Sequence, residues 1–385
     1  MGPGRARPAR WYQGVRALAA GFESFTLSEG SATLDSNRDQ RLAINNIDEN
    51  NSARGRLIAQ LQTGRLIGCI GAGVSVWAGY RSWKGVIDRL AAEVELRRHG
   101  EVDTQLVIQN HGADLLLCAR RLGNDLGEPA FTNFIRTEFG PQDGPVHDVL
   151  LRISALPLRH ALTLNFEHSY ENAHALRGAD CRTISSCDRR AMARFLRDLD
   201  DPAYPKHAVH LHGKYDDPIE RIALTETGYT ELYRNNALFK NFVWTVAATK
   251  HLLFLGFGFT DTDFTNILRD CARDLNGIGL HHFALVGLRP EENDGQMRTL
   301  LNDRYLVDPI FYNVVINADG QPNHDEFVGI INAISVALGM PEPAPALGFP
   351  VAPAPAVPVG PDDERRAEEL NQRLLRRIDP GGNGV

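Results

Sequence analysis

Four short segments that lie far apart in the chain carry residues suited to nucleotide binding and proton transfer. They are residues 71–75, 163–167, 211–214 and 256–261. Glycines in the first and last segments let a backbone approach a pyrophosphate, whose charge backbone N–H groups and a helix N-terminus offset. The amide of Asn165 can hold a hydroxyl or a water, and the imidazole of His212 can accept a proton near neutral pH. These residue types indicate chemistry on a nucleotide.

The first segment ends an apolar run and opens a helical pattern. Residues 66–70 read as a buried strand, the chain turns at Gly71-Ala-Gly73, and a helix is expected over 83–96. A strand that ends in a glycine turn is the usual opening of a nucleotide site. The turn lacks the last glycine of G-x-G-x-x-G, and no Gly-Lys-Ser/Thr follows it. On these residues alone, a nucleotide loop and a plain tight turn both stay open.

Each of the other candidate residues also has a structural interpretation. Asn165 can cap a turn, His212 can be a buried structural histidine, and Glu167 can be an early-turn acid favoured by a helix dipole. Residues 260–261, Thr-Asp, are typical of an N-cap, which leaves Gly256 and Gly258 to approach a ligand.

The elements that position these residues alternate between strand and helix. Strands are expected at 66–70, 159–166, 181–185, 207–213, 251–256, 282–286 and 311–316, and helices at 52–64, 168–176, 188–199, 226–250, 261–275, 294–304 and 325–338. Between the first two strands, the apolar residues recur with the period of a helix over 83–98, 103–122, 127–139 and 145–153. The sequence predicts an α/β, Rossmann-like, doubly wound and mostly parallel sheet with a helical insert at about 95–155.

Composition narrows the class of protein. The 385 residues are 43% hydrophobic with a net charge of -7, which favours a globular domain and argues against direct nucleic-acid binding. The five cysteines show no Cys-x-x-Cys spacing, so we expect no zinc module, no other metal site and no disulfide framework. No apolar run is long enough to span a membrane, and no secretory signal is evident. A cytoplasmic location is expected.

The two ends of the chain differ from the middle. Residues 1–50 are expected to be an N-terminal extension, either a solvated tail or a basic arm that contacts a partner or nucleic acid. The central domain is expected over 51–340. Residues 341–385 read as a Pro/Ala-rich linker and a short charged C-terminal helix, either a frayed tail or a peptide that docks on a partner.

The order of the four segments resembles the sirtuin family, and more closely the sirtuin-like NAD hydrolases of bacterial anti-phage systems. The chain has Gly-Ala-Gly-x-Ser, then Thr-x-Asn-aromatic-acid, then Leu-His-Gly, then an apolar strand into Gly-x-Gly. Residues 79–83, Gly-Tyr-Arg-Ser-Trp, and 224–229 also match stretches of those domains. The resemblance covers roughly residues 52–340.

Site roles follow from this resemblance position by position. It implies that Asn165 and His212 are catalytic, with Asn165 holding the nicotinamide ribose and the attacking water. The residues it places against NAD+ are Gly71, Ala72, Gly73, Val74, Ser75, Trp83, Phe166, Glu167, Gly256 and Phe257. Glu167 stands where the family usually has Asp, and the Asp-Phe-Arg of the sirtuin cofactor loop is absent around residues 80–84.

The resemblance implies an NAD+ hydrolase that releases nicotinamide and ADP-ribose and depletes NAD+ in anti-phage defence. It further implies a homo-oligomer and a ring-shaped HerA-type ATPase as partner. The alternatives are an NAD-dependent protein deacylase, against which the missing four-cysteine zinc module argues, and a non-catalytic nucleotide-binding assembly subunit. A plain dehydrogenase lacks support, because no acid follows the glycine turn at the usual spacing of roughly 20 residues.

Overall fold

The protein is described here from a computed structural model. It covers residues 44–341 except 100, 113, 143–145 and 318–321. The expected basic arm, the Pro/Ala-rich linker and the C-terminal helix lie outside the described residues.

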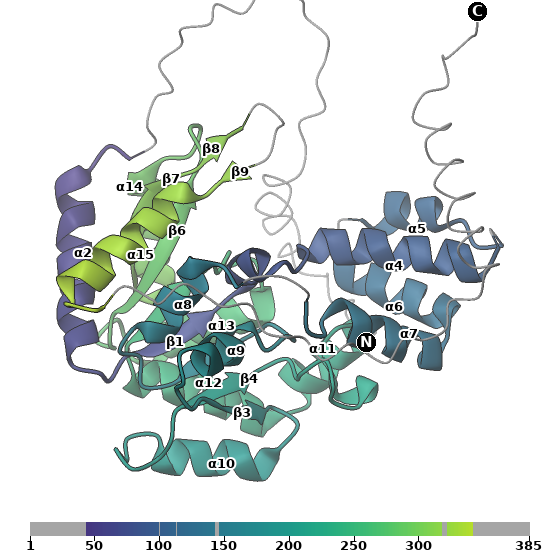
Figure 1. The fold of residues 1–385 in the computed structure, drawn as a ribbon, viewed down its shortest axis with the longest axis horizontal. Helices are drawn as coiled ribbons and strands as arrows, with labels where there is room; N and C mark the ends of the chain where they lie inside the picture. The colour runs from purple at the N-terminus through teal and green to yellow at the C-terminus, as the bar shows by residue number, and fades with distance from the viewer. Residues whose placement is uncertain (1–43, 100, 113, 143–145, 318–321, 342–385) are drawn as a thin grey trace, which may run out of the picture.

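A seven-stranded parallel sheet forms the centre of the described part of the chain (Figure 1). Its strands are β1 (Ile67–Ile70), β2 (Ala161–Thr163), β3 (Arg182–Ser185), β4 (His207–His210), β5 (Leu252–Leu255), β6 (His282–Leu288) and β7 (Val307–Asn313). Their order is β3-β4-β2-β1-β5-β6-β7, so the chain builds one half of the sheet from β1 and then crosses to build the other. This is a doubly wound, Rossmann-like α/β fold, as the sequence predicts.

The register of the central strands brings their carboxyl ends to one edge of the sheet. Ile70 of β1 is level with Thr163 of β2 and Leu255 of β5, and Thr163 is level with His210 of β4. The residues that follow β1, β2, β4 and β5 therefore leave the sheet side by side.

Helices cover both faces of the sheet. On one face lie α2 (Ile47–Gln62), α8 (Asp148–Ala155), α9 (Ser169–Leu176) and α15 (Asp325–Ala337). On the other lie α10 (Arg189–Asp198), α12 (Ala237–Thr249), α13 (Thr262–Asp274) and α14 (Asp294–Tyr305). Because strand side chains alternate, Leu253 and Leu255 of β5 pack with the first group, whereas Leu252 and Phe254 pack with the second. Burying each such side chain contributes about 1.5–3 kcal/mol.

A separate group of helices follows β1 and extends away from the sheet (Figure 1). It comprises α4 (Trp83–Arg97), α5 (Thr104–His111), α6 (Leu115–Leu126) and α7 (Glu128–Glu138), which share an apolar core of their own. Phe166, Ile222 and Leu224 from the sheet side complete that core. The helical group is therefore packed against the loops that follow β2 and β4.

The remaining short elements occur in loops. They are α3 (Ala72–Ser75), η2 (Val76–Ala78), η3 (Ile219–Arg221), α11 (Glu226–Tyr229), η4 (Thr230–Arg234) and the antiparallel pair β8 (Val315–Ile316) and β9 (Pro322–Asn323).

Side-chain caps divide two helices that the sequence predicts as continuous. Asp114 accepts a hydrogen bond from the N–H of Leu117 and starts α6, which splits the helix expected over 103–122. Asn236 accepts one from the N–H of Phe239 and starts α12, which splits the helix expected over 226–250. Such caps satisfy N–H groups that a helix start leaves without partners.

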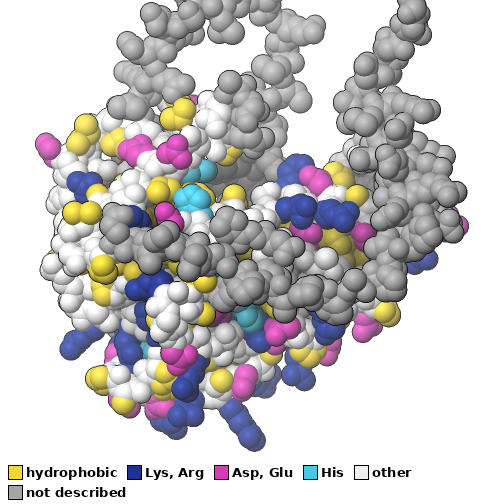
Figure 2. All heavy atoms as spheres, viewed as in Figure 1, with side chains coloured by type: hydrophobic (Ala, Val, Ile, Leu, Met, Phe, Trp, Pro, Cys, Tyr) yellow, Lys and Arg dark blue, Asp and Glu magenta, His cyan; other side chains and the backbone are white. Residues whose placement is uncertain are grey.

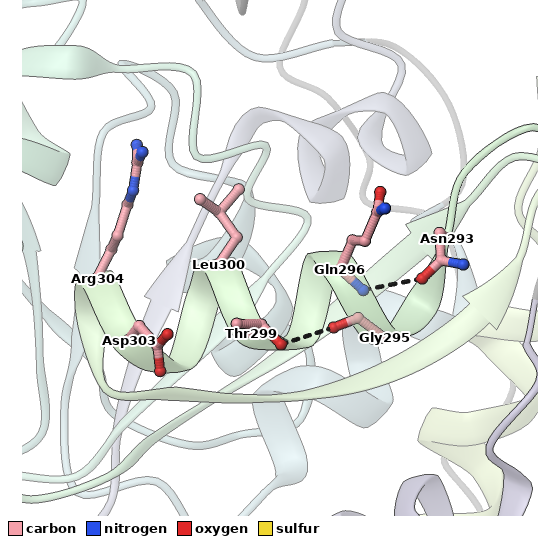
Figure 3. Close-up of a pocket in the computed structure, with 7 residues that line it drawn as sticks. All are labelled: Asn293, Gly295, Gln296, Thr299, Leu300, Asp303 and Arg304. Carbon is pink, nitrogen blue, oxygen red and sulfur yellow. Dashed lines mark hydrogen bonds between the residues drawn. The ribbon is translucent and has the colours of Figure 1, made fainter.

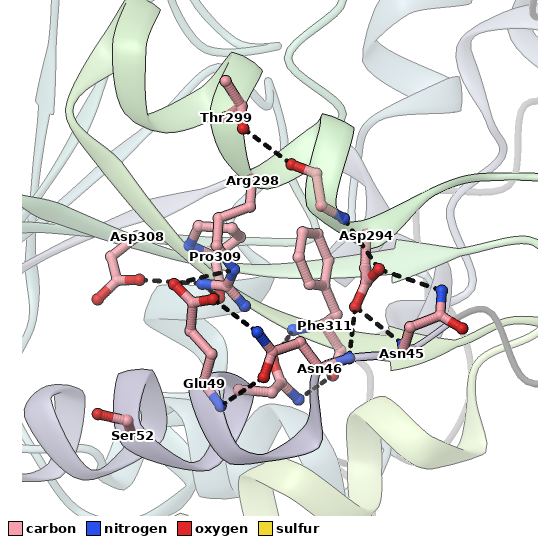
Figure 4. A network of polar contacts seen from close by, with 12 residues as sticks. Asn45, Asn46, Glu49, Ser52, Asp294, Arg298, Thr299, Asp308, Pro309 and Phe311 are labelled. Carbon is pink, nitrogen blue, oxygen red and sulfur yellow. Dashed lines mark hydrogen bonds and ion pairs between the residues drawn. The ribbon is translucent and has the colours of Figure 1, made fainter.

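A polar network joins the residues before α2 to Asp294, the first residue of α14 (Figure 4). The backbone N–H groups of Asn45 and Asn46 each donate to Oδ2 of Asp294 at 2.9 Å, and the side chain of Asn46 caps the helix through the N–H of Glu49. The helix therefore begins at Ile47, five residues before the predicted start.

On the face shown in Figure 2, basic and acidic side chains are interspersed, with Lys and Arg gathered at the lower end of the view. None of the described helices is long and apolar enough to cross a membrane.

Candidate active site

The glycine loop after β1 interlocks with the loop after β5. The N–H of Gly71 donates to the carbonyl of Leu255, and the N–H of Gly73 donates to the carbonyl of Gly256, both at 2.9 Å. A Cβ on Gly71 would lie 2.4 Å from the carbonyl oxygen of Gly256, so only glycine allows this approach. Ala72 and Gly73 are exposed at the start of α3. Ala72 and Gly73 are thus the exposed residues of the predicted pyrophosphate loop, and the N–H of Gly73 already has a partner within the protein.

These two loops meet where the order of the sheet reverses. After β1 the chain builds β2, β3 and β4 on one side, and then returns to place β5 on the other side of β1. In open α/β sheets, ligands bind outside the carboxyl ends of the strands at this switch point. Residues 71–75 and 256–257 therefore lie where open α/β sheets bind ligands.

A buried hydrogen-bond network joins the glycine loop to the loop after β2. The Oγ of Ser75 accepts a hydrogen bond from Nδ2 of Asn165 at 2.8 Å and donates to Oε1 of Glu167. The other carboxylate oxygen of Glu167 accepts from the N–H of Ser169 at 2.6 Å, at the start of α9. Both carboxylate oxygens of Glu167 therefore have partners within the protein.

The backbone of Asn165 is fixed as well. Its N–H donates to Oγ1 of Thr163 at 3.0 Å, and that hydroxyl donates to the carbonyl of Ile70 at 2.9 Å. Asn165 is 9% exposed, and its amide already has one protein partner. It therefore has a fixed position from which its amide oxygen can accept a hydrogen bond.

His212 lies in a second buried network. Its Nε2 is 2.7 Å from the hydroxyl of Tyr233 and 3.5 Å from Oδ2 of Asp261, and its Nδ1 is 3.4 Å from the hydroxyl of Tyr229. Burial lowers the pKa of His212 despite the nearby carboxylate of Asp261, which acts in the opposite direction. The imidazole is therefore neutral at neutral pH and able to accept a proton.

Asp261 has a dual role in this network. Its Oδ1 accepts from the N–H of Phe264 at 2.9 Å and caps α13, as the sequence predicts. Its Oδ2 accepts from the hydroxyl of Tyr229 at 3.1 Å, so the cap also orients a tyrosine against His212. The tyrosines at 229 and 233 were not predicted as partners; their spacing of four residues, on one face of a helix, is the signal that the sequence offers.

Phe166 packs beside His212 and against the helical group. Its ring centroid lies 6.3 Å from that of His212 and 5.0 Å from that of Phe139, at the end of the helical group. Among the described residues, no hydrogen bond joins Asn165 to His212 directly. The two predicted catalytic side chains thus belong to neighbouring loops with independent supports.

The other predicted NAD+ contacts have different surroundings. Phe257 packs among Phe254, Phe259 and Phe264 with centroids 5.1–5.4 Å apart, beside Gly256. Val74 is fully buried in the sheet core. Trp83 begins α4 and packs on the core of the helical group.

A surface hollow of about 570 Å³ lies elsewhere, along α14. Figure 3 shows its lining residues, Asn293, Gly295, Gln296, Thr299, Leu300, Asp303 and Arg304. The hydrogen bonds drawn there are the cap of α14 and a contact within the same helix. None of the predicted site residues lines this hollow, so we place the candidate site at the sheet edge instead.

Comparison with known proteins supports the sirtuin-like character of the chain. Residues 159–310 match the family described as SIR2-like domain. The chain is 25% identical over 238 residues to Defense-associated sirtuin 2 of Bacillus subtilis, an alignment that covers 60% of this chain and 22% of that protein. It is 25% identical over 225 residues to the NAD(+) hydrolase ThsA of Enterococcus faecium, covering 58% of this chain and 43% of that protein.

The chain thus spans less than half the length of either relative. The matches nevertheless confirm the predicted resemblance to sirtuin-like NAD hydrolases of bacterial defence.

Proposed function

Because the chain carries a SIR2-like domain, we propose that it is an NAD+ hydrolase that cleaves the bond between nicotinamide and ribose. The observation that carries the proposal is the convergence of the loops after β1, β2, β4 and β5 at the switch point of the sheet. The name of the ThsA relative supports the same reaction.

Nicotinamide in NAD+ is already a cationic leaving group, so its departure needs no general acid. The electron pair of the broken C–N bond goes to the nicotinamide nitrogen, and ribose becomes an oxocarbenium-like centre. Water adds to that centre and loses one proton, which gives ADP-ribose. The protein must bind the dinucleotide in a reactive pose, exclude other nucleophiles and accept the proton.

In this proposal the two buried networks have different roles. Asn165, held by Ser75, positions the ribose and the attacking water through its amide. His212, neutral and oriented by Tyr229 and Tyr233, accepts the proton from that water or from a ribose hydroxyl. The glycine loop binds the pyrophosphate at its exposed residues, Ala72 and Gly73.

The remaining predicted contacts complete the NAD+ site in this proposal. Gly256 and Phe257 lie under the adenosine ribose. Glu167 takes the place of the family's Asp near the carboxamide, and Phe166 and Trp83 line the nicotinamide side.

The biological setting belongs to the same proposal. We infer that the enzyme acts in the cytoplasm and depletes NAD+ during phage infection, as a homo-oligomer together with a ring-shaped HerA-type ATPase. The name of the Bacillus relative supports a defence role, and the partner rests on the family resemblance. All five cysteines are free, which fits a reducing compartment.

The test is to follow nicotinamide release from NAD+ by chromatography, with the purified chain alone and with the ATPase of a neighbouring gene. His212→Ala and Asn165→Ala should each abolish release while circular dichroism shows that the fold is intact. His251→Gln is the matched control, because His251 precedes β5 at the opposite end of the sheet.

Three outcomes would contradict the proposal. Full activity in either alanine variant would remove that residue from the mechanism. Tight NAD+ binding without turnover under both conditions would indicate a non-catalytic assembly subunit. Release that requires an acyl-lysine peptide would indicate a deacylase.

A further inference from the structure

Two histidines and a glutamate meet behind the loop that carries Asn165. His168 lies immediately before α9, Glu171 is in the first turn of that helix, and His210 ends β4. One ligand-type atom from each residue lies within 4.8 Å of those of the other two. His210 is fully buried and Glu171 is 8% exposed. Sequence spacing does not reveal this cluster, because 39 residues separate Glu171 from His210.

The hydrogen bonds of His210 define which of its nitrogens is available. Its Nδ1 lies 2.8 Å from the carbonyl oxygen of Asn165, which can only accept, so Nδ1 carries a hydrogen. Its Nε2 lies 2.8 Å from Oε1 of Glu171. Either a second proton or a cation must lie between this nitrogen and that carboxylate oxygen.

Two further atoms distinguish these possibilities. Nε2 of His168 and Oε2 of Glu171 are both buried and have no hydrogen-bond partner among the described residues. A proton shared by His210 and Glu171 leaves both atoms unsatisfied. Both ring nitrogens of His174 on the same helix are also buried without a partner, but among the described residues three ligand-type atoms converge only at His168, Glu171 and His210. A cation bound between the three side chains would give these donor atoms a common partner.

We propose that His168, Glu171 and His210 form a binding site for a divalent transition-metal ion of the Zn²⁺ class. Two imidazoles and one carboxylate are a ligand set that zinc and its neighbours prefer. Tetrahedral ligands at about 2.0–2.1 Å from zinc lie about 3.3 Å from one another, so small side-chain rotations close the cluster around an ion.

Neighbouring hydrogen-bonding groups hold Glu171 and His210 in place, as they hold the ligands of known metal sites. The hydroxyl of Thr183 donates to Oε1 of Glu171 at 3.0 Å, and the carbonyl of Asn165 holds Nδ1 of His210. Such contacts fix the tautomer and orientation of a metal-binding histidine. The ion would thereby anchor the backbone of Asn165 from the side away from Ser75, a positioning role that is independent of NAD+ chemistry.

The first test uses the full chain purified without a histidine tag. Elemental analysis should find about one zinc ion per chain, chelation should lower the melting temperature, and added Zn²⁺ should restore it. Co²⁺ in place of zinc should give visible d–d absorption bands. A chain that contains no metal and shows no thermal shift with Zn²⁺, Co²⁺, Ni²⁺ or Mn²⁺ would overturn the proposal and leave an ordinary ion pair.

The second test assigns the ligands. Glu171→Gln and His168→Gln should each weaken Zn²⁺ binding by roughly 10–100-fold or more and remove the cobalt bands. His174→Gln is the matched control, because His174 is buried on the same helix but outside the cluster. Unchanged zinc affinity in both ligand variants would reject this site. Metal content and melting temperature are read without NAD+, so this result is separable from failure of the hydrolase proposal.

Discussion

Replacing Gly256 by alanine should disrupt the junction between β1 and β5. Gly256 has φ +59°, in the left-handed region that favours glycine. A Cβ at this position would lie 2.4 Å from the backbone nitrogen of Val74 and 2.8 Å from the carbonyl carbon of Gly73. Both neighbours are backbone atoms of the glycine loop, so that loop as a whole must move.

The expected cost has two parts. A left-handed conformation costs a residue with a side chain about 1–2 kcal/mol, and overpacking a close contact costs about 1–3 kcal/mol. The sum for Gly256→Ala is about 2–5 kcal/mol of unfolding free energy. Domains of 150–250 residues lose about 2–4 °C per kcal/mol, so the melting temperature should fall by on the order of 10 °C.

Gly258→Ala provides the matched control in the same loop. A Cβ there meets only the side chain of Thr260, at 3.6 Å, which is an ordinary contact. Thermal unfolding of both variants and NAD+ binding by calorimetry measure the effect. Gly258→Ala should resemble wild type in thermal unfolding, whereas Gly256→Ala should lose stability and NAD+ binding. Equal melting temperatures for the two variants would refute the interlocked geometry.

Two further predictions concern the histidines. Tyr233→Phe removes the hydroxyl 2.7 Å from Nε2 of His212. Losing this hydrogen bond should raise the activation free energy by about 1–1.5 kcal/mol and slow nicotinamide release about tenfold. An unchanged rate would exclude an orienting role for Tyr233. Burial lowers the pKa values of His160, His174 and His282 from 6.5 to about 3. The unfolded chain therefore binds more protons below pH 6.5, and stability should fall with acidification by up to about 1.4 kcal/mol per pH unit for each histidine. Calorimetry from pH 7.5 to 5.5 tests this, and a constant melting temperature would contradict it.

The local pattern of apolar residues predicted which segments are helices and strands better than it predicted where they begin and end. Helix and strand types followed from apolar period and glycine stops, because burial on two sheet faces requires apolar side chains at fixed intervals. The boundaries depended on caps and distant contacts. The helix predicted from residue 52 begins at Ile47 because Asn46 caps it, and Asp294, 248 residues from Asn46, holds the backbone N–H groups of Asn45 and Asn46 just before it. Nothing within the helix itself indicates that partner.

The supports of the candidate site could not be predicted from the sequence. Asn165 and His212 were identified by residue type and by the order of motifs, and their roles stay predictions. The contact of Ser75 with Glu167 joins residues 92 positions apart, and the tyrosine partners of His212 lie 17 and 21 positions further along the chain. Side-chain direction and register decide such contacts, and both are set only when the sheet assembles.

The sequence by itself determined that strands and helices alternate, that glycine turns end two strands, and that an amide and an imidazole follow two others. The tertiary structure decided that β4, β2, β1 and β5 are neighbours, so that all four loops leave one edge. It also decided that ligand-type atoms of His168, Glu171 and His210 lie within 4.8 Å of one another. The physical reason is that residue types and periods are local properties, whereas strand order arises from the simultaneous burial of both sheet faces.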